Sequence, residues 1–211
     1  MIDGDGARTW IGSFIGAFRE QRAALDDLDR RSGDGDFGSN LLPAIEGALE
    51  GAGALSPGRA FTVLGRACMA AGGTSGPLFG VWFRELGRAG GDEPAVDLGA
   101  LAVGAAAGLE AVCKLGGARV GDKTMVDAMD PAAAALTSAH ERGETLYAAL
   151  DDAATAARAA AHRTAALLAK RGRASYVGEA SRGVEDPGAV AVALFFEAHP
   201  RLMSRAGASG G

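Results

Sequence analysis

Apolar residues recur at helical spacing along almost the whole chain, and this periodicity limits its fold more than any other feature. Trp10, Phe14 and Phe18 follow one another at intervals of four residues, and Leu28 continues the same face. An apolar stripe of this period predicts an amphipathic helix, and we expect the first one to end near Gly33. No convincing pair of β-strands is found in the sequence. The chain is therefore predicted to be all-α.

Helix-start and helix-stop residues divide the rest of the chain into seven further predicted helices. Ser56 and Pro57 give one of them a capping hydroxyl and a proline at its first position, where the missing N–H costs nothing. Pro131 predicts a bend or an interruption, because a proline inside a helix removes a hydrogen bond. We expect these helices over 39–49, from 57, over 74–89, from Asp97, after Asp122, over 144–171 and after 188. Eight helices joined by short glycine-rich turns indicate an antiparallel bundle.

Composition limits the kinds of partner. A chain of 211 residues has the size of one domain, which we expect to span 1–211. Its formal charge of −5 and its scattered arginines argue against nucleic acid. Apolar runs are broken before the roughly 18 residues of a membrane span, and no secretory signal pattern opens the sequence. We therefore expect a cytoplasmic protein without a membrane partner. Cys68 and Cys113 are expected to be buried thiols, and the three histidines to lie at surface or cap positions.

The stretch "RRSGDGDFGSN" combines a glycine-rich turn with closely spaced carboxylates. Gly33, Gly35 and Gly38 match the GxGxxG spacing of dinucleotide-binding folds, but a helix precedes them in place of the required strand. An EF-hand that begins at Asp34 also fails, because Gly38 and Ser39 would occupy positions that need an acidic ligand and a glycine. Neither motif explains the stretch.

Asp29, Asp34 and Asp36 can converge, because Asp29 lies on the last turn of the first helix and the loop doubles back past it. Three carboxylates this close would raise one another's pKa unless a cation neutralised them. Oxygen ligands of this kind suit Mg²⁺, which commonly completes its shell with water and substrate phosphates. The N–H groups at the start of the second helix, from Gly38 to Asn40, are expected to point toward such phosphates. Taken alone, the stretch fits a solvated turn with capping aspartates equally well.

Three further stretches place glycines and polar residues before helix starts. They are "GGTSGPLFG" at 72–80, "GGARVGDKTMVDA" at 116–128 and "KRGRASYVGEASRGVEDPGAV" at 170–190. In the second of them, Gly116 and Gly121 have the spacing of a Walker A motif. Asp122 intrudes before the lysine, however, and no strand precedes the glycines, so we reject a P-loop.

Together, "LDRRSGDGDFGSN", "GGTSGPLFG", "GDKTMVDAMDPA" and "GRASYVGE...DPGA" resemble, in order, the nucleotide-binding L subunits of dihydroxyacetone kinases and the equivalent domain of single-chain dihydroxyacetone kinases. The resemblance covers residues 28 to 189. It implies an eight-helix antiparallel bundle or barrel with a nucleotide and Mg²⁺ at one end. It also implies a phosphotransferase that becomes active with a partner K subunit carrying dihydroxyacetone, because this chain lacks that subunit's substrate-binding histidine.

The resemblance also implies roles for particular residues. Asp29, Asp34 and Asp36 would hold two Mg²⁺ ions that bridge the phosphates of ADP or ATP, and no further catalytic residue is assigned. Lys123 and Asp127 belong to a matching motif and would serve either the phosphate or the architecture of the site. The residues expected around the nucleotide are Phe37, Gly38, Ser39, Asn40, Thr74, Ser75, Gly116, Met125, Arg173, Asp186, Pro187 and Gly188.

Phe37 departs from the family pattern, which usually has a histidine at this position. A phenyl ring cannot donate a hydrogen bond to phosphate. The loss of one charge-assisted bond would weaken nucleotide binding by about ten- to a hundredfold if nothing replaced it. The departure leaves open a kinase for another short ketose and a non-catalytic nucleotide-binding regulatory module. The phosphoryl donor is also open: exchangeable ATP, or a tightly held ADP that a phosphocarrier subunit of the phosphotransferase system rephosphorylates.

Overall fold

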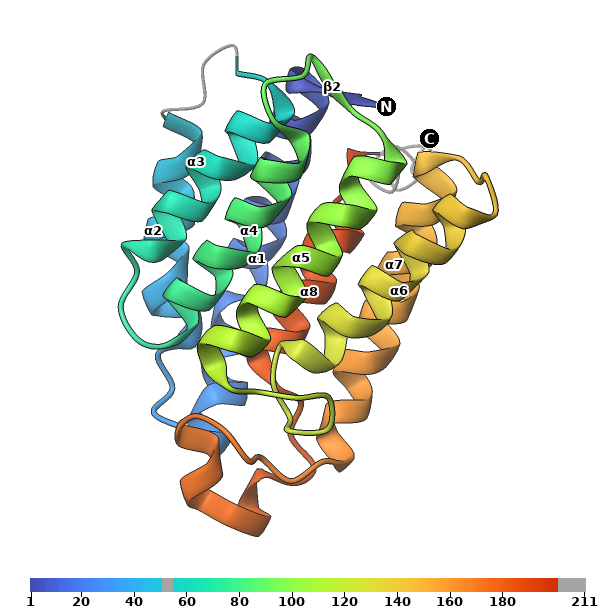
Figure 1. Ribbon diagram of the computed structural model, residues 1–211. Coiled ribbons are helices and arrows are strands. Elements are labelled where there is room, and N and C mark those ends of the chain that lie inside the picture. Colours follow the sequence, from blue (N-terminus) through green and yellow to red (C-terminus); the bar gives the residue numbers. More distant parts are fainter. Residues whose placement is uncertain (51–54, 201–211) are drawn as a thin grey trace, which may run out of the picture.

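The computed structural model describes residues 1–50 and 55–200. Over these residues the chain forms a bundle of eight α-helices with two 3-10 segments (Figure 1). The helices are α1 (Gly4–Ser32), α2 (Phe37–Glu50), α3 (Pro57–Met69), α4 (Ser75–Gly90), α5 (Leu98–Gly116), α6 (Val126–Glu141), α7 (Leu146–Arg163) and α8 (Pro187–Glu197). The 3-10 segments are η1 (Thr164–Ala166) and η2 (Arg173–Ser181). The predicted all-α bundle is confirmed.

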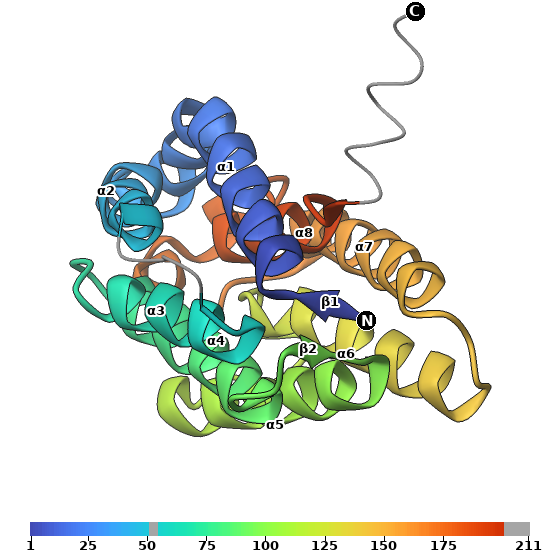
Figure 2. The same cartoon turned by 90° about the horizontal axis from the view of Figure 1, so that it is seen from above.

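Each helix packs on the next one in the chain, and α8 closes the ring against α1. Figure 2, which looks along the bundle, shows α8 between α1 and α7. Helix α8 is buried at every position from Pro187 to Phe196, because it also contacts α6. The helix expected after 188 is therefore found, and it is an internal helix of the bundle.

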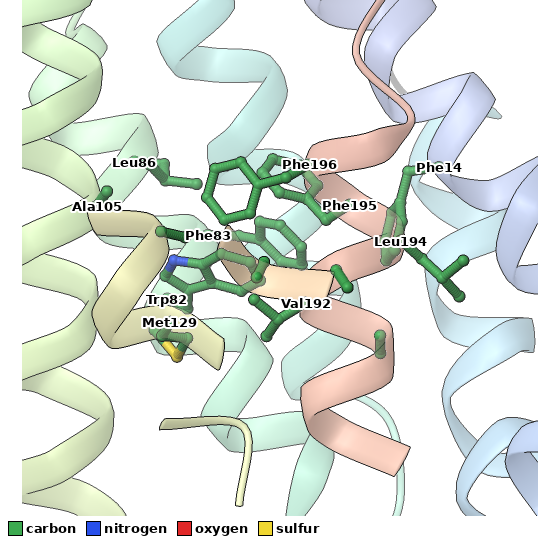
Figure 3. Close-up of a cluster of buried hydrophobic side chains, with 14 of the residues drawn as sticks. Phe14, Trp82, Phe83, Leu86, Ala105, Met129, Val192, Leu194, Phe195 and Phe196 are labelled. Carbon is green, nitrogen blue, oxygen red and sulfur yellow. The ribbon is translucent and has the colours of Figure 1, made fainter. Parts of the chain in front are cut away.

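Aromatic side chains from α1, α4 and α8 form the centre of the core (Figure 3). The rings of Trp82 and Phe83 stack at 4.8 Å, and Phe195 packs edge-on against both. The indole N–H of Trp10 donates to the carbonyl of Phe195 at 2.6 Å, so this buried donor is satisfied. The aromatic centre fixes α8 relative to α1 and α4, whose ends carry the loops described below.

Helix caps agree with the sequence. The side chains of Ser56, Asp97 and Asp186 each accept an N–H from the first turn of α3, α5 and α8. Helices α3 and α4 approach closely because glycines line their contact. A Cβ added at Gly58 would lie 2.2 Å from the carbonyl oxygen of Gly91.

Four expectations need correction. The chain does contain a strand pair, since β1 (Ile2–Asp3) pairs antiparallel with β2 (Ala95–Val96), a ladder too short to produce a periodic pattern. Helix α7 ends at Arg163 and not near Arg171. Helix α6 is not interrupted at Pro131, which lies inside its bounds, so of the two expected effects of this proline the interruption is wrong. His199 is fully buried at the end of α8, with Nε2 3.1 Å from a carboxylate oxygen of Asp151.

Helix α5 also differs from the sequence-based expectation. Within the described residues it is the one helix whose length and mean hydropathy, 1.6, would suit a membrane span. It packs along α4 on one side and α6 on the other, as the other bundle helices do with their neighbours.

Both cysteines are free thiols; Cys68 is buried, as expected, but Cys113 on α5 is half-buried.

Candidate functional site

A pocket opens at one end of the bundle, where the loops between helices meet. The α1–α2, α3–α4 and α5–α6 loops, the start of η2 and the start of α8 all contribute to its lining. The expected site residues that line it are Asp29, Asp34, Asp36, Phe37, Asn40, Thr74, Ser75, Gly116, Met125, Arg173, Asp186, Pro187 and Gly188. The two remaining expected residues, buried Gly38 and exposed Ser39, do not line the pocket. The helix-start motifs therefore meet in space, although they are far apart in the sequence.

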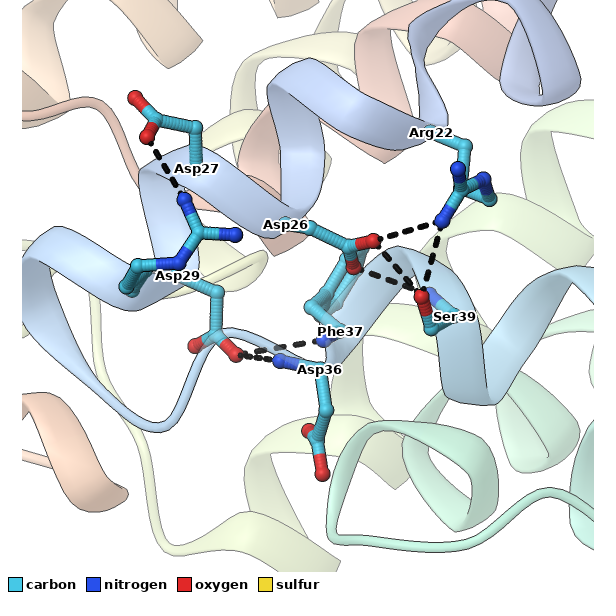
Figure 4. A network of polar contacts seen from close by, with 8 residues as sticks. Arg22, Asp26, Asp27, Asp29, Asp36, Phe37 and Ser39 are labelled. Carbon is cyan, nitrogen blue, oxygen red and sulfur yellow. Dashed lines mark hydrogen bonds and ion pairs between the residues drawn. The ribbon is translucent and has the colours of Figure 1, made fainter.

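Asp29, Asp34 and Asp36 converge at the pocket. One carboxylate oxygen from each lies within 4.8 Å of the others, so the three could share cations. Oδ2 of Asp29 accepts the backbone N–H group of Gly35 at 2.9 Å. It also accepts those of Asp36 at 2.9 Å and of Phe37 at 3.2 Å, which are drawn in Figure 4. These three bonds hold the turn against the end of α1. The acid cluster is thus ordered by the chain itself.

Gly35 makes the turn possible. Its φ is +81°, a left-handed conformation that favours glycine. A Cβ at this position would also lie 2.9 Å from Cβ of Arg30 on α1. Any side chain here would therefore displace the turn from Asp29.

The start of α2 differs from the sequence-based expectation. The N–H of Ser39 donates to Oδ1 of Asp26 at 2.9 Å, and the N–H of Asn40 donates to the carbonyl of Asp36 at 2.8 Å. These two donors are engaged within the protein and do not point at a phosphate. Gly38 packs against α1, where a Cβ would lie 2.8 Å from the carbonyl oxygen of Arg22.

The start of α4, unlike that of α2, has no side-chain capping bond to its backbone N–H groups. Its N-cap residue, Thr74, makes no side-chain capping bond, and both Thr74 and Ser75 line the pocket. Unengaged N–H groups at a helix start attract anions, and the helix dipole adds to that attraction. This helix start is better placed than that of α2 to receive a phosphate.

The phenyl ring of Phe37 packs into the core beneath the acid cluster. Its centroid lies 6.2 Å from that of Phe18 and 6.3 Å from that of Phe79, and the residue is 7% exposed. The residue forms part of the pocket floor while most of its ring faces apolar neighbours. The ring at position 37 therefore joins the loop to the core.

Lys123 and Asp127 hold loops together. The ammonium of Lys123 donates to the carbonyl of Thr164 at 2.6 Å and to that of Val184, and the residue is 2% exposed. Burial lowers the pKa of Lys123, against the opposing charges of Asp186 and Asp127. The carboxylate of Asp127 accepts the N–H groups of Gly121 at 2.6 Å and Thr124 at 2.8 Å. These contacts favour the architectural interpretation of both residues.

Thr164 explains why α7 ends early. Its carbonyl receives Lys123, and its hydroxyl oxygen accepts the N–H of Asp186 at 2.8 Å. These contacts draw the chain out of the helix toward the pocket, and Leu167 is already extended. The alanine-rich sequence gives no stop signal that would reveal this.

Asp186 caps α8 at the back of the pocket, where Oδ2 accepts the N–H of Ala189 at 2.7 Å. Burial raises the pKa of Asp186 to about 7, and the charges of Asp127 and Asp29 act in the same direction. The bond from Ala189 and the charge of Lys123 oppose the shift. The pocket therefore contains one carboxyl group that titrates near neutrality.

Three basic residues from the 170–173 loop, Lys170, Arg171 and Arg173, pair with acids at the pocket end. Arg173 forms an ion pair with Asp34, a member of the acid cluster. Arg171 lies 3.3 Å from the carboxylate of Asp122, which also accepts the N–H of Arg119 at 3.0 Å. Burial alone would raise the pKa of Asp122, but the bond from Arg119 and the charges of Arg171 and Lys170 hold it below its usual value.

Sequence reasoning missed Asp26 and Arg22, which bind Ser39 behind the acid cluster. Asp26 stands three residues before Asp29, a spacing that puts both on one face of α1, and this signal could have identified it.

Comparisons with known proteins agree with this geometry. The sequence pattern of the DAK2 domain matches residues 31–200. The chain is 36% identical to the ADP-binding subunit DhaL of a PEP-dependent dihydroxyacetone kinase from Listeria innocua, over 93% of this chain and 95% of that one. It is 39% identical to an L-erythrulose 1-kinase of Mycolicibacterium smegmatis, over 88% of this chain and 33% of that protein.

A solved structure has the same fold. The dihydroxyacetone kinase of C. freundii, in complex with AMP-PNP and Mg²⁺, superposes with a TM-score of 0.67 and 27% identity. The match covers 94% of this chain and 33% of that one. The chain thus spans nearly the whole of the DhaL subunit and about a third of the longer kinases.

Proposed function

Because this chain belongs to the DAK2 domain family, we propose that it is the nucleotide-binding subunit of a dihydroxyacetone kinase. It holds Mg-ADP or Mg-ATP in the pocket and transfers a phosphoryl group to dihydroxyacetone on a partner K-type subunit. The observation that carries this proposal is the convergence of Asp29, Asp34 and Asp36 at the mouth of a pocket that the start of α4 also lines. The whole chain serves as one domain of this type, and we place it in the cytoplasm.

Asp29, Asp34 and Asp36 are the proposed ligands of two Mg²⁺ ions. Their oxygen donors, close spacing and access to the pocket fit this ion. When held by these three carboxylates, Mg²⁺ would supply positive charge against the phosphates during phosphoryl transfer. Oδ2 of Asp29 already accepts three N–H groups, so Oδ1 is the oxygen that Asp29 offers to a cation.

Other pocket residues have separate tasks in this proposal. The start of α4, with Thr74 and Ser75, receives a phosphate. Arg173 stands beside the acid cluster and can turn its charge toward the same phosphates. Leu78, Val112 and Met125 line the apolar part of the pocket and exclude water from the bound nucleotide.

A partner that covers the pocket mouth is supported by exposed apolar side chains around it. Leu115, Val120, Tyr176 and Val177 are exposed by 55%, 61%, 89% and 42%. Each lies within three residues of a residue that lines the pocket. Exposed apolar patches mark protein interfaces, and we propose that these four side chains contribute to one. The K-type subunit would dock here and bring its substrate to the nucleotide.

The phosphoryl donor is either ATP that exchanges at the pocket or a phosphocarrier subunit that rephosphorylates bound ADP. Relatives named as PEP-dependent and PTS-dependent favour the second route. Similarity of 38–39% to erythrulose kinases supports a second candidate function, a kinase for a short ketose other than dihydroxyacetone. A third candidate is a non-catalytic nucleotide-binding module, which follows from the sequence because Phe37 stands where the resemblance leads us to expect a histidine.

Reconstitution tests the proposal. The purified chain is mixed with a K-type subunit, Mg²⁺ and either dihydroxyacetone or erythrulose. ATP is the donor in one series, and ADP with a phosphocarrier system and phosphoenolpyruvate is the donor in the other. We expect a phosphorylated ketose in one series and none without this chain. Tight Mg-dependent nucleotide binding without product in any combination would favour the regulatory module.

A further inference from the structure

Hydrogen bonds join α1 to the start of α2 at two places, which we call clasps. In the first, Asp29 accepts the N–H groups of residues 35–37, and in the second, behind the acid cluster, Asp26 binds Ser39. Asp26 is 5% exposed and does not line the pocket. Oδ1 accepts the N–H of Ser39 at 2.9 Å, and Oδ2 accepts the hydroxyl of Ser39 at 2.7 Å. Arg22 donates to Oδ2 of Asp26 and to the hydroxyl oxygen of Ser39, both at 3.1 Å (Figure 4). The buried carboxylate is thus fully engaged.

The two clasps together determine where Asp36 lies. Asp29 accepts the N–H groups of residues 35–37, the last of which begins α2. Asp26 accepts the N–H group of Ser39, two residues later. Asp26 and Asp29 are three residues apart on α1, so one rigid helix face supplies both acceptors. A segment held at both ends from a single helix has little freedom to move its side chain at position 36.

Gly38 lets α2 approach α1 at this point. A Cβ there would lie 2.8 Å from the carbonyl oxygen of Arg22 and 3.0 Å from Oδ1 of Asp26. The absence of a side chain at position 38 therefore belongs to the second clasp and not to the ligand pocket.

We propose that Asp26 is a positioning residue for the cation site: with Ser39 and Arg22 it holds the start of α2 so that Asp36 meets Asp29 and Asp34. The inference rests on the proposed function, because it concerns the same site. Outer groups that orient metal ligands in this way commonly contribute about ten- to a hundredfold to metal affinity.

The test measures how much Mg²⁺ strengthens ADP binding, as the ratio of the Kd in EDTA to the Kd in saturating Mg²⁺. Asp26→Asn is nearly isosteric and removes the charge that Arg22 and Ser39 bind. We expect it to lower this ratio about tenfold while the Kd in EDTA stays within about twofold. Asp27→Asn is the matched control, because Asp27 is exposed on the same helix and pairs with Arg30. It should leave the ratio unchanged.

A double-mutant cycle separates positioning from a general loss of stability. Asp36→Ala should abolish most of the Mg²⁺ effect, and Asp26→Asn should then add little to it. Two outcomes would overturn the inference and leave the proposed function standing. In one, the losses of the two variants are additive. In the other, Asp36→Ala lowers the ratio but Asp26→Asn leaves it unchanged. An unchanged ratio in Asp36→Ala would instead overturn the metal site itself. If Asp26→Asn does not fold, Ser39→Ala replaces it in the cycle and should lower the ratio by a smaller factor.

Discussion

Asp34 and Arg173 form an ion pair across the mouth of the pocket, although Asp34 lies between α1 and α2 and Arg173 begins η2. The guanidinium thereby supplies positive charge to a cluster of three carboxylates. It competes with a cation for Asp34, but it can join that cation in binding phosphates.

This relationship predicts opposite effects of Arg173→Ala on two ligands. Mg²⁺ alone should bind more tightly, because a competing charge is gone. Mg-ADP should bind about tenfold more weakly, because a charge-assisted bond to phosphate is lost. Calorimetric titrations with each ligand measure both effects. Lys170→Ala, which removes a neighbouring exposed charge, should change neither, and weaker binding of both ligands by Arg173→Ala would refute the competition.

The position of Phe37 predicts that restoring the family's histidine does not restore a phosphate contact. The ring packs on Phe18 and Phe79, so Phe37→His places a polar ring among apolar neighbours. We expect the free energy of unfolding to fall by about 1–3 kcal/mol, with no gain in ADP affinity. Urea unfolding and calorimetry provide the two values. Unchanged stability together with tighter ADP binding would show that this side chain faces the nucleotide.

The bonds of Lys123 predict a larger effect on stability than on binding. Lys123→Met keeps the length of the side chain but leaves the buried carbonyls of Thr164 and Val184 without their donor. An unsatisfied buried polar group costs about 1–3 kcal/mol, so we expect a loss of that order or more. At a temperature where the variant is folded, its affinity for Mg-ADP should stay within about threefold of wild type. Lys114→Met, an exposed change near the end of α5, is the control. A large loss of affinity at unchanged stability would assign Lys123 to the phosphate.

Asp186 predicts a pH dependence of stability. The pKa of this carboxyl is about 7 in the folded chain and about 3.9 in an unfolded one, so the folded state binds the proton more tightly. Its contribution to stability is present below about pH 4 and is lost as the pH rises toward 7. Asp186→Asn keeps an oxygen that can accept the N–H of Ala189 and does not titrate. The stability of wild type relative to this variant should therefore fall between pH 5 and pH 8. Parallel stability curves would contradict the shift.

The exposed apolar side chains near the pocket mouth predict a variant that impairs assembly with the K-type subunit and nothing else. Tyr176→Ser combined with Val120→Ser changes two side chains that are exposed by 89% and 61%. Stability and Mg-ADP affinity should match wild type, while phosphoryl transfer with a K-type subunit should fall about tenfold or more. Val103→Ser is the control, because Val103 is also exposed but lies toward the other end of α5 from the lining residues Val112 and Gly116. Unimpaired transfer by the double variant would place the partner elsewhere.

Local patterns explain how much of this fold and site could be predicted from the sequence. Apolar spacing predicts the helices, and Ser56, Asp97 and Asp186 mark three helix starts through caps that need only neighbouring residues. The convergence of Asp29 with Asp34 and Asp36 is also local, because a turn that contains Gly35 folds back on the end of α1.

Tertiary contacts explain the expectations that failed. The N–H of Ser39 on α2 donates to Asp26 on α1. Helical periodicity does not predict this contact, because it does not say which residues of two helices meet. Lys123 meets carbonyls from residues 164 and 184, and the same contacts end α7 within an alanine-rich run. A resemblance between motifs predicts that such residues matter. It does not predict which groups they bind, because their partners come from distant parts of the chain that meet only in the folded bundle.

The most direct test of the central claim is calorimetric titration of the purified, nucleotide-free chain with ADP and ATP, with and without Mg²⁺. It is carried out beside the double variant Asp34→Ala/Asp36→Ala and the control Asp27→Asn. We expect Mg-dependent binding by wild type and by the control, and its loss in the double variant. A folded wild-type chain that binds neither nucleotide in the presence of Mg²⁺ would contradict the proposed nucleotide site.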